Sequence, residues 1–285
     1  MQQFINRIAS NLMANRRNFL KMGILSLGAL PFMGAAFASY KNIFSDKLNE
    51  NGMKRLGLIG GTSWHSTVDY YRYINQMVND IKGDRINPPL LIFNLNQYRI
   101  NELQAQNKWD EIANIYTEAA NDLIKAGVKG FVLCSNTAHA IYDTLSERID
   151  FPILHIADAT AIEAEKLGLK KLGLLGTRYT MEKRYIKNRL TEKFGLKIIT
   201  PEKNSRLELA RIIQNELSAG IIKDKSKKYI ISEMDILKKE GAKGMILGCT
   251  EIPEIIKQKD YSLPVFDTTY LHCKMAVDFI LGKNK

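Results

Sequence analysis

The chain has 285 residues, of which 45% are hydrophobic and 25% are charged. This composition is that of a globular protein with about two domains, and it excludes a disordered chain, a collagen and a coiled coil. Three cysteines are too few for a disulfide framework, so burial of apolar side chains must supply the core. The formal charge of +11 would suit nucleic acid or a membrane, but the lysines are scattered without interleaved aromatic residues. We therefore expect solvated basic faces and no nucleic-acid partner.

Residues 1–38 are predicted to be an export signal. They hold four of the 41 basic residues and no acidic one, which leaves 37 basic against 30 acidic residues in the rest. Arg16-Arg17 precede an uncharged run from Met22 to Phe37, and Ala36-Phe37-Ala38 is typical of a signal-peptide cleavage site. The arginine pair resembles the twin-arginine signal for export of folded proteins, although Asn15 replaces its usual Ser or Thr. We expect cleavage after Ala38 and a mature protein in a bacterial periplasm, and the alternative is an uncleaved membrane anchor.

From Lys54 onward, short apolar runs alternate with amphipathic stretches, as in parallel strands joined by helices. Strands are predicted at residues 55–60, 90–95, 130–134, 171–176, 196–200 and 244–248. Helices are predicted at residues 65–81, 110–126, 157–167, 206–218 and 227–239. In the first helix we expect one apolar stripe to face the core, made of Val68, Tyr71, Ile74, Met77 and Val78. The predicted fold class is α/β.

Two segments of the chain are repeated at nearly equal offsets. Residues 54–60 recur at 170–176, and residues 126–133 recur at 240–247. We therefore predict two similar lobes, each a parallel sheet flanked by helices, related by a pseudo-two-fold axis with the active site in the cleft between them. The predicted boundaries are a linker at 39–53, a first lobe at 54–153 completed by 266–285, and a second lobe at 154–265.

The second repeat places Ser135 opposite Cys249, each just beyond the end of a predicted strand. One proton-carrying side chain from each lobe is what proton transfer at both faces of a carbon requires. A following helix N-terminus would lower the pKa of a thiol and so favour the thiolate. The alternative is that Cys134 and Cys249 are small buried side chains, as free cysteines commonly are.

Three strings carry a resemblance to a known family: Gly60-Gly61-Thr62-Ser63-Trp64, Asn136-Thr137-Ala138-His139 and Gly248-Cys249-Thr250-Glu251. Over residues 54 to 280 the chain resembles the aspartate/glutamate racemase superfamily, in particular its aspartate racemase and amino-acid racemase branch. The resemblance implies racemisation without pyridoxal phosphate, any other cofactor or a metal. In this family two cysteines flank the substrate α-carbon, one removing a proton as thiolate and the other returning one to the opposite face.

The chain departs from this family pattern at its first cysteine. That cysteine directly precedes Asn-Thr in the family, where this chain has Ser135, and Cys134 stands one residue earlier. Because strand side chains alternate, Cys134 is expected to point away from the cleft. We therefore assign catalysis to Cys249 and Ser135. An alcohol is a weaker acid and base than a thiol, so we do not expect two equivalent thiols; a local shift bringing in Cys134 is the alternative.

The resemblance also implies a set of substrate-binding residues with hydroxyl, amide and carboxylate side chains. The set consists of Thr62, Ser63, Gln97, Asn136, Thr137, Thr177, Thr180, Thr250 and Glu251. The alternative for the hydroxyl and amide residues is a role as helix caps. His139 and Glu251 would orient the reacting groups, although a buried, hydrogen-bonded position in the core is the commoner role of a histidine.

The predicted function is that of a periplasmic racemase, an isomerase that interconverts L- and D-amino acids of the aspartate or glutamate type. Two alternatives stay open: a single-thiol decarboxylase or isomerase of small dicarboxylates, and a non-catalytic two-lobed protein that binds amino acids. The expected partners are the amino-acid substrate and the export machinery. Because family members are often dimers, a homodimer is also an expectation.

Overall fold

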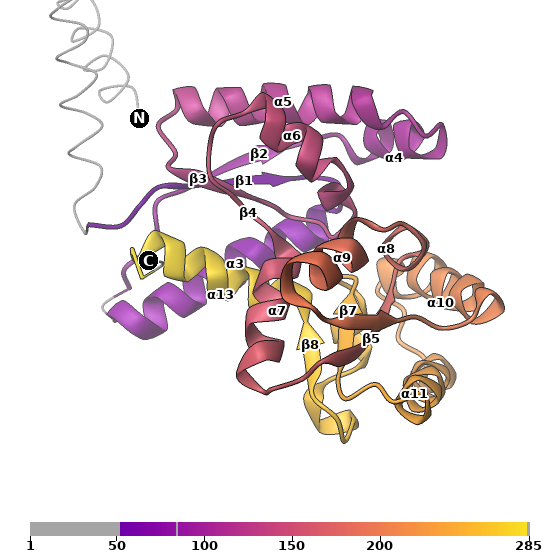
Figure 1. Cartoon of the computed structure of the whole chain (residues 1–285). Coiled ribbons are helices and arrows are strands. Elements are labelled where there is room, and N and C mark those ends of the chain that lie inside the picture. The colour runs from indigo at the N-terminus through magenta and orange to yellow at the C-terminus, as the bar shows by residue number, and fades with distance from the viewer. Residues whose placement is uncertain (1–51, 84, 284–285) are drawn as a thin grey trace, which may run out of the picture. The chain divides into compact units, whose positions relative to one another are not determined.

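Eight short strands form two separate parallel sheets in the computed structural model, which describes residues 52–83 and 85–283 (Figure 1). The predicted export signal and most of the predicted linker lie outside the described residues, and the lobe boundaries stay a prediction. In the described part of the chain, no helix combines the length and apolar character needed to cross a bilayer.

The two sheets have the same strand order. In the first sheet the order is β2-β1-β3-β4, with β1 at Leu56–Gly60, β2 at Leu90–Asn94, β3 at Gly130–Leu133 and β4 at Ile153–Leu154. In the second sheet the order is β6-β5-β7-β8, with β5 at Lys171–Gly176, β6 at Lys197–Ile199, β7 at Met245–Gly248 and β8 at Val265–Asp267. This duplication confirms the predicted α/β class with two similar lobes.

Long helices connect most of the strands. They are α3 (Trp64–Lys82), α5 (Trp109–Lys125), α7 (Ile156–Lys166), α10 (Lys203–Asn215), α11 (Asp224–Lys239) and α13 (Thr268–Ile280). Shorter helices are α4 (Gln97–Ala105), η1 (Thr137–Ile141), α6 (Tyr142–Arg148), α8 (Arg178–Glu182), α9 (Tyr185–Asn188), η2 (Arg189–Lys193), η3 (Leu217–Ala219), α12 (Ile252–Ile255) and η4 (Gln258–Asp260). The sequence predicted the first five long helices to within a few residues, and it missed α13, β4, β8 and the short helices.

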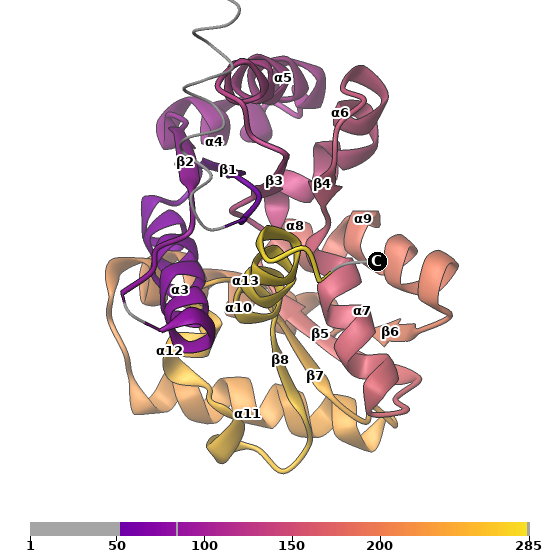
Figure 2. The same cartoon turned by 90° about the vertical axis from the view of Figure 1, so that its left-hand side faces the viewer.

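Each sheet is covered on both faces, so its strands are apolar throughout. In the first sheet Leu56 and Leu58 pack against α3 and α13, whereas Ile59 packs against α4, α5 and α6. In the second sheet alternate residues face α7 on one side and the α10 and α11 pair on the other (Figure 2). This alternation assigns every residue near a strand end to one face.

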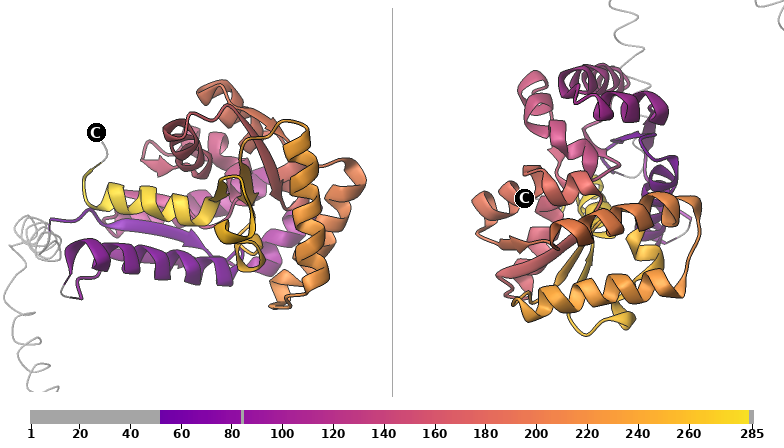
Figure 3. Two further views of the ribbon diagram at one scale, coloured as in Figure 1. Left: turned by 90° about the horizontal axis from the view of Figure 1, so that it is seen from below. Right: turned by 90° about the vertical axis from the view of Figure 1, so that its right-hand side faces the viewer.

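The C-terminal helix packs in the core of the first sheet, although the strand before it belongs to the second sheet. Helix α13 follows β8 and packs against α3 and α7 (Figure 3). Near its end, the backbone N–H of Lys54 donates to the Ile280 carbonyl at 2.8 Å. The chain therefore crosses from the second lobe back onto the first.

The predicted apolar stripe of α3 is only partly correct. Ile74 and Val78 are fully buried, whereas Val68 and Tyr71 are each 51% exposed. The helix instead buries Tyr70, whose hydroxyl reaches the Nδ1 atom of His272 at 2.7 Å. A buried partner for the phenol lets the helix turn Tyr70 toward the sheet, and this leaves Tyr71 on the surface.

The strand pairing agrees with the repeat offset at the carboxyl ends of β3 and β7. Gly176 of β5 pairs with Gly248 of β7, and a Cβ on Gly176 would lie 2.6 Å from the Gly248 carbonyl oxygen. In the first lobe Ile59 pairs with Leu133, and the next residue, Cys134, donates its N–H to the Ile59 carbonyl at 3.0 Å. Cys134 thus corresponds to Gly248, and the residue after each is Ser135 or Cys249.

Candidate active site

Cys249 lies directly beyond β7 and shares one carboxylate oxygen with its neighbour. Its Sγ donates to the Oε2 atom of Glu251 at 2.7 Å, and the Thr250 hydroxyl donates to the same oxygen at 2.8 Å. The thiol is buried against the α10 and α11 face of the second sheet. The structure therefore brings three predicted site residues, Cys249, Thr250 and Glu251, into one hydrogen-bonded group.

Burial raises the pKa of the Cys249 thiol well above its usual value, and the negative charge of Glu251 raises it further. The expectation of a pKa lowered by a helix N-terminus was wrong, because the following helix α12 has a single turn of four residues. The resting group is a thiol hydrogen-bonded to a carboxylate. Transfer of the proton from Sγ to Glu251 would yield a thiolate without adding a second buried charge.

Cys134 is excluded from this group by the alternation of the strand. It is buried on the α3 and α13 face of the first sheet, in one cluster with Tyr70 and Cys273. Burial raises the pKa of its thiol. Cys134 therefore lies on the opposite face of the sheet from Leu133, as strand alternation requires. The half-buried Ser135 is the next residue along the chain.

Asn136 links the two lobes through the hydroxyl of Thr268. The Nδ2 atom of Asn136 lies 3.0 Å from Thr268 Oγ1, and that hydroxyl donates to the Leu247 carbonyl at 2.8 Å. Since Thr268 gives its only proton to the carbonyl, the amide of Asn136 must be the donor to it. The Oδ1 atom of Asn136 is buried and has no partner among the described residues. A buried free acceptor of this kind suits the ammonium group of a ligand.

A second set of hydroxyls extends from α8 to the first lobe. Thr177 caps α8 by accepting the N–H of Thr180 at 3.2 Å, and the two hydroxyls lie 3.0 Å apart. Thr180 in turn lies 3.2 Å from the hydroxyl of Tyr185, on α9, which packs against η1. Burial raises the pKa of Tyr185 and the nearby Cys249 adds to this, whereas the hydroxyls of Thr180 and Thr137 act in the opposite direction. Tyr185 therefore lies beside predicted site residues of both lobes.

The sequence analysis did not single out Thr268 or Tyr185. A polar pair, Thr268-Thr269, follows the short apolar strand β8, and recognition of that strand would have pointed to Thr268. Nothing in the local sequence distinguishes Tyr185 from an ordinary helix residue. Both residues act through contacts between parts of the chain that lie far apart in the sequence.

The remaining predicted residues make no contact with the Cys249 group among the hydrogen bonds of the described residues. Ser63 caps α3, since its hydroxyl accepts the N–H of Ser66 at 3.4 Å. Gln97 is exposed at the start of α4, which is capped by Asn96. Thr62 lies in the turn after β1, and its buried hydroxyl has no hydrogen-bond partner within the described segments. Ser63 thus fills the capping role that the sequence left as an alternative.

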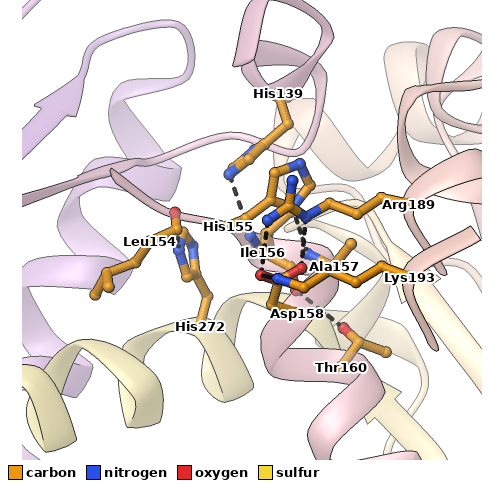
Figure 4. Close-up of polar contacts among 10 residues, drawn as sticks. All are labelled: His139, Leu154, His155, Ile156, Ala157, Asp158, Thr160, Arg189, Lys193 and His272. Atoms are coloured by element: carbon orange, nitrogen blue, oxygen red, sulfur yellow. Dashed lines mark hydrogen bonds and ion pairs between the residues drawn. The ribbon is translucent and has the colours of Figure 1, made fainter. Parts of the chain in front are cut away.

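Three buried histidines, His139, His155 and His272, lie close together (Figure 4). The ring centroid of His139 lies 4.6 Å from that of His155 and 5.5 Å from that of His272. Nearby, Asp158 accepts two hydrogen bonds from Arg189, at 2.5 and 2.8 Å, and one from Lys193. No set of three or more metal-ligating side chains in the described part of the chain could hold a metal ion.

Backbone partners fix the proton on each of these rings. His139 donates from Nδ1 to the Ser135 carbonyl and accepts the Ile156 N–H at Nε2. His272 donates from Nε2 to the Leu154 carbonyl, and His155 accepts the N–H of Ala157 at Nδ1. Burial lowers the pKa of His139 to about 4 and that of His272 to about 3, and it also lowers the pKa of His155. All three rings are therefore neutral near pH 7.

Taken together, the fold and the site define a two-lobed α/β protein of the racemase type, with a thiol and a hydroxyl at equivalent strand ends. The model of the Asp/Glu/Hydantoin racemase family matches residues 59–276, and the chain belongs to this family. The family membership confirms the resemblance drawn from the three sequence strings.

Solved structures and a curated enzyme support the same assignment. A proposed Asp/Glu racemase from Yersinia pestis is 43% identical, with a TM-score of 0.77 over 80% of this chain and 100% of that chain. An aspartate racemase homologue from Pyrococcus horikoshii OT3 is 34% identical, with a TM-score of 0.71 over the same shares. Glutamate racemase 3 from Caldanaerobacter subterraneus subsp. tengcongensis is 29% identical over 152 residues, which is 52% of each chain. The chain thus spans about half the length of this curated relative.

The neutral histidines predict that the protein loses stability in mild acid. Their pKa values are lower in the folded than in the unfolded chain, so only the unfolded chain takes up protons as the pH falls below about 6.5. Each histidine should then reduce the free energy of unfolding by about 2 kcal/mol between pH 7.5 and 5. Urea unfolding across this interval, above the range in which most carboxylates titrate, measures the effect.

The matched control for this prediction is His139→Gln, which removes one of the three titrating rings. The variant should be less stable at pH 7.5, but its stability should fall by about 2 kcal/mol less on acidification. An equal pH dependence in the two proteins, or a constant free energy of unfolding in the native protein, would contradict the prediction.

Proposed function

We propose that this protein is a racemase of aspartate, glutamate or a related acidic amino acid and that it works without pyridoxal phosphate. The observation that carries the proposal is the buried Cys249 and Glu251 pair, which occupies the position that the repeat makes equivalent to Ser135. Family membership supports the reaction class. The similar proteins include a glutamate racemase and an aspartate racemase homologue, and these names support an acidic substrate.

In the proposed reaction Glu251 first takes the proton of Cys249. The thiolate then removes the α-proton of the L-amino acid, and the electron pair of the broken C–H bond stays on the α-carbon, delocalised into the carboxylate. Ser135 gives its hydroxyl proton to the opposite face, which forms the D-amino acid and leaves an alkoxide. Solvent carries the proton held by Glu251 to this alkoxide and restores the resting state. The reverse sequence converts the D-amino acid.

Substrate binding is proposed to use the polar groups that the two lobes leave at their strand ends. The free Oδ1 atom of Asn136 would accept from the α-ammonium group. The hydroxyls of Thr137 and Thr177 would donate to the carboxylates.

The serine in place of a second thiol also supports one alternative, a single-thiol decarboxylase or isomerase of small dicarboxylates. Such an enzyme would consume its substrate without interconverting amino-acid enantiomers. A non-catalytic binding protein would bind an amino acid and leave its α-proton in place. Proton exchange therefore separates the three functions.

Proton NMR in heavy water tests the proposal, because it measures exchange of the substrate α-proton. Because a thiol serves only one face of the substrate, we expect L-aspartate or L-glutamate to exchange its α-proton with retained configuration faster than it inverts. The reason is that a thiol returns solvent deuterium more readily than an alcohol supplies a proton to the other face. The L-isomer is expected because the family resemblance places the second-lobe cysteine on that side. Since racemisation has an equilibrium constant of one, kcat/KM must be equal in both directions, and exchange is the more informative measurement.

Ser135→Cys is the matched variant for this test, because it restores the missing thiol. It should raise inversion relative to exchange. Equal exchange of both enantiomers in the native protein, together with no gain in Ser135→Cys, would show that another group supplies the second proton.

The cysteines should differ sharply in their importance. Cys249→Ala should lower kcat/KM by at least ~10²-fold, the loss expected when a general base is removed. Cys134→Ala should keep most of the activity, since Cys134 is buried on the other face of its sheet with a raised pKa. Racemisation followed by polarimetry or chiral chromatography measures both. An active Cys249→Ala beside an inactive Cys134→Ala would refute the assignment.

We further propose that the protein acts in the periplasm after cleavage behind Ala38. Expressed in a bacterium with a twin-arginine pathway, the periplasmic protein should begin at Ser39 and hold three free thiols by intact mass. Replacing both Arg16 and Arg17 by lysine should retain the chain in the cytoplasm. A periplasmic protein that keeps residues 1–38, or an active form with a Cys134 to Cys249 disulfide, would contradict the proposal.

A further inference from the structure

The ring of His139 joins two backbone segments that are far apart in the sequence. Its Nδ1 atom donates to the Ser135 carbonyl at 2.9 Å, and its Nε2 atom accepts the N–H of Ile156 at 3.2 Å. Ser135 lies between β3 and η1, whereas Ile156 is the first residue of α7. The ring is only 1% exposed, so water does not compete for either bond.

A single state of the ring makes both bonds. A carbonyl can only accept and a backbone N–H can only donate, so His139 must be neutral with its proton on Nδ1. Burial lowers its pKa to about 4 and keeps the ring in this state at neutral pH. Packing against His155 and His272 on either side fixes the plane of the ring.

These two hydrogen bonds, which we call the His139 bridge, connect Ser135 to the lobe that carries Cys249. Ile156 packs in the second-lobe cluster, together with Leu172 of β5 and Ile246 of β7. Beyond Cys134 the first-lobe segment has left the strand ladder, so strand pairing no longer fixes the Ser135 peptide. The bond from His139 therefore orients that peptide, while the contact between Asn136 and Thr268 holds the next residue.

We propose that His139 is a positioning residue for the second proton carrier of the reaction. By holding the Ser135 carbonyl against the start of α7, it fixes the angle from which the Ser135 hydroxyl reaches the substrate face opposite Cys249. The inference rests on the proposed function, because it assigns His139 to one half of that reaction. His139 does not act on the half carried out by Cys249.

Two substitutions separate the ends of the bridge. In His139→Asn the side-chain amide nitrogen takes the place of Nδ1, so the donor to Ser135 is kept and the acceptor for Ile156 is lost. In His139→Gln the amide carbonyl reaches the place of Nε2, so the acceptor for Ile156 is kept and the donor to Ser135 is lost. Both variants replace an aromatic ring by a smaller amide, and each serves as the stability control of the other.

The readout is the ratio of inversion to retained α-proton exchange of the L-amino acid in heavy water. His139→Gln should lower this ratio at least ~10-fold, because a misplaced group costs one to two orders of magnitude in rate. His139→Asn should lower it much less. Retained exchange depends on Cys249 and should stay near the native rate in both. An unchanged ratio in His139→Gln, or the same fall in both variants, would overturn the inference.

The native protein separates failure of the inference from failure of the proposed function. If the native protein neither exchanges nor inverts, the proposed function falls and the inference falls with it. If it does both and the two rates drop together in His139→Gln, only the positioning role is refuted.

A variant at the other end of the bridge covers the case in which His139→Gln does not fold. Ile156→Pro removes the N–H that orients the ring, and proline is tolerated at the first position of a helix. The preceding His155 has φ −102° and ψ 127°, which a following proline allows. Because this variant loses the same bond as His139→Asn and keeps the donor to Ser135, its ratio should fall as little as in His139→Asn. A fall of ~10-fold or more, the size expected for His139→Gln, would count against the inference.

Discussion

The hydroxyl of Thr268 contacts both lobes near their strand ends. Thr268 accepts from the Asn136 amide and donates to the Leu247 carbonyl, so the loop after β3 and the end of β7 are held to the same atom. Ser135 directly precedes Asn136, and Cys249 follows Leu247 by two residues. A hydroxyl with a single proton can make this pair of bonds in one direction only. The relative placement of both proposed proton carriers therefore depends on Thr268.

Burial keeps the Cys249 thiol and the nearby histidines uncharged. It raises the pKa of the Cys249 thiol and lowers the pKa values of His139 and His272, so that each group is driven to its neutral form. The Glu251 carboxylate accepts a hydrogen bond from this thiol. In the proposed reaction this proton moves from sulfur to oxygen. A free thiolate, which the sequence pattern predicted, is not needed in the resting protein.

The sequence predicted the duplicated fold because buried parallel strands are continuous apolar runs, and two such runs recur with their glycines. It missed β4 and β8, which have two and three residues and are too short to show any periodicity. At the site, Cys249, Glu251 and Asn136 were found because they stand in recognisable strings beside strand ends. Thr268 lies 132 residues from Asn136, and only the folded chain brings the two together. The bridge of His139 was out of reach for the same reason.

The C-terminal helix has a consequence for the order in which the protein can fold. Residues of α13, among them Cys273, Val277 and Ile280, complete the core that also contains Leu56 and Leu58 of the first strand. The first lobe is therefore unfinished until the last helix has left the ribosome, and until then α3 covers only part of one face of its early strands. Contacts between the two ends of the chain also close late, because the connecting loop spans nearly the whole described sequence. The first lobe to be synthesised is in this sense the last to be completed, and a chain cut between the lobes would leave it without part of its core.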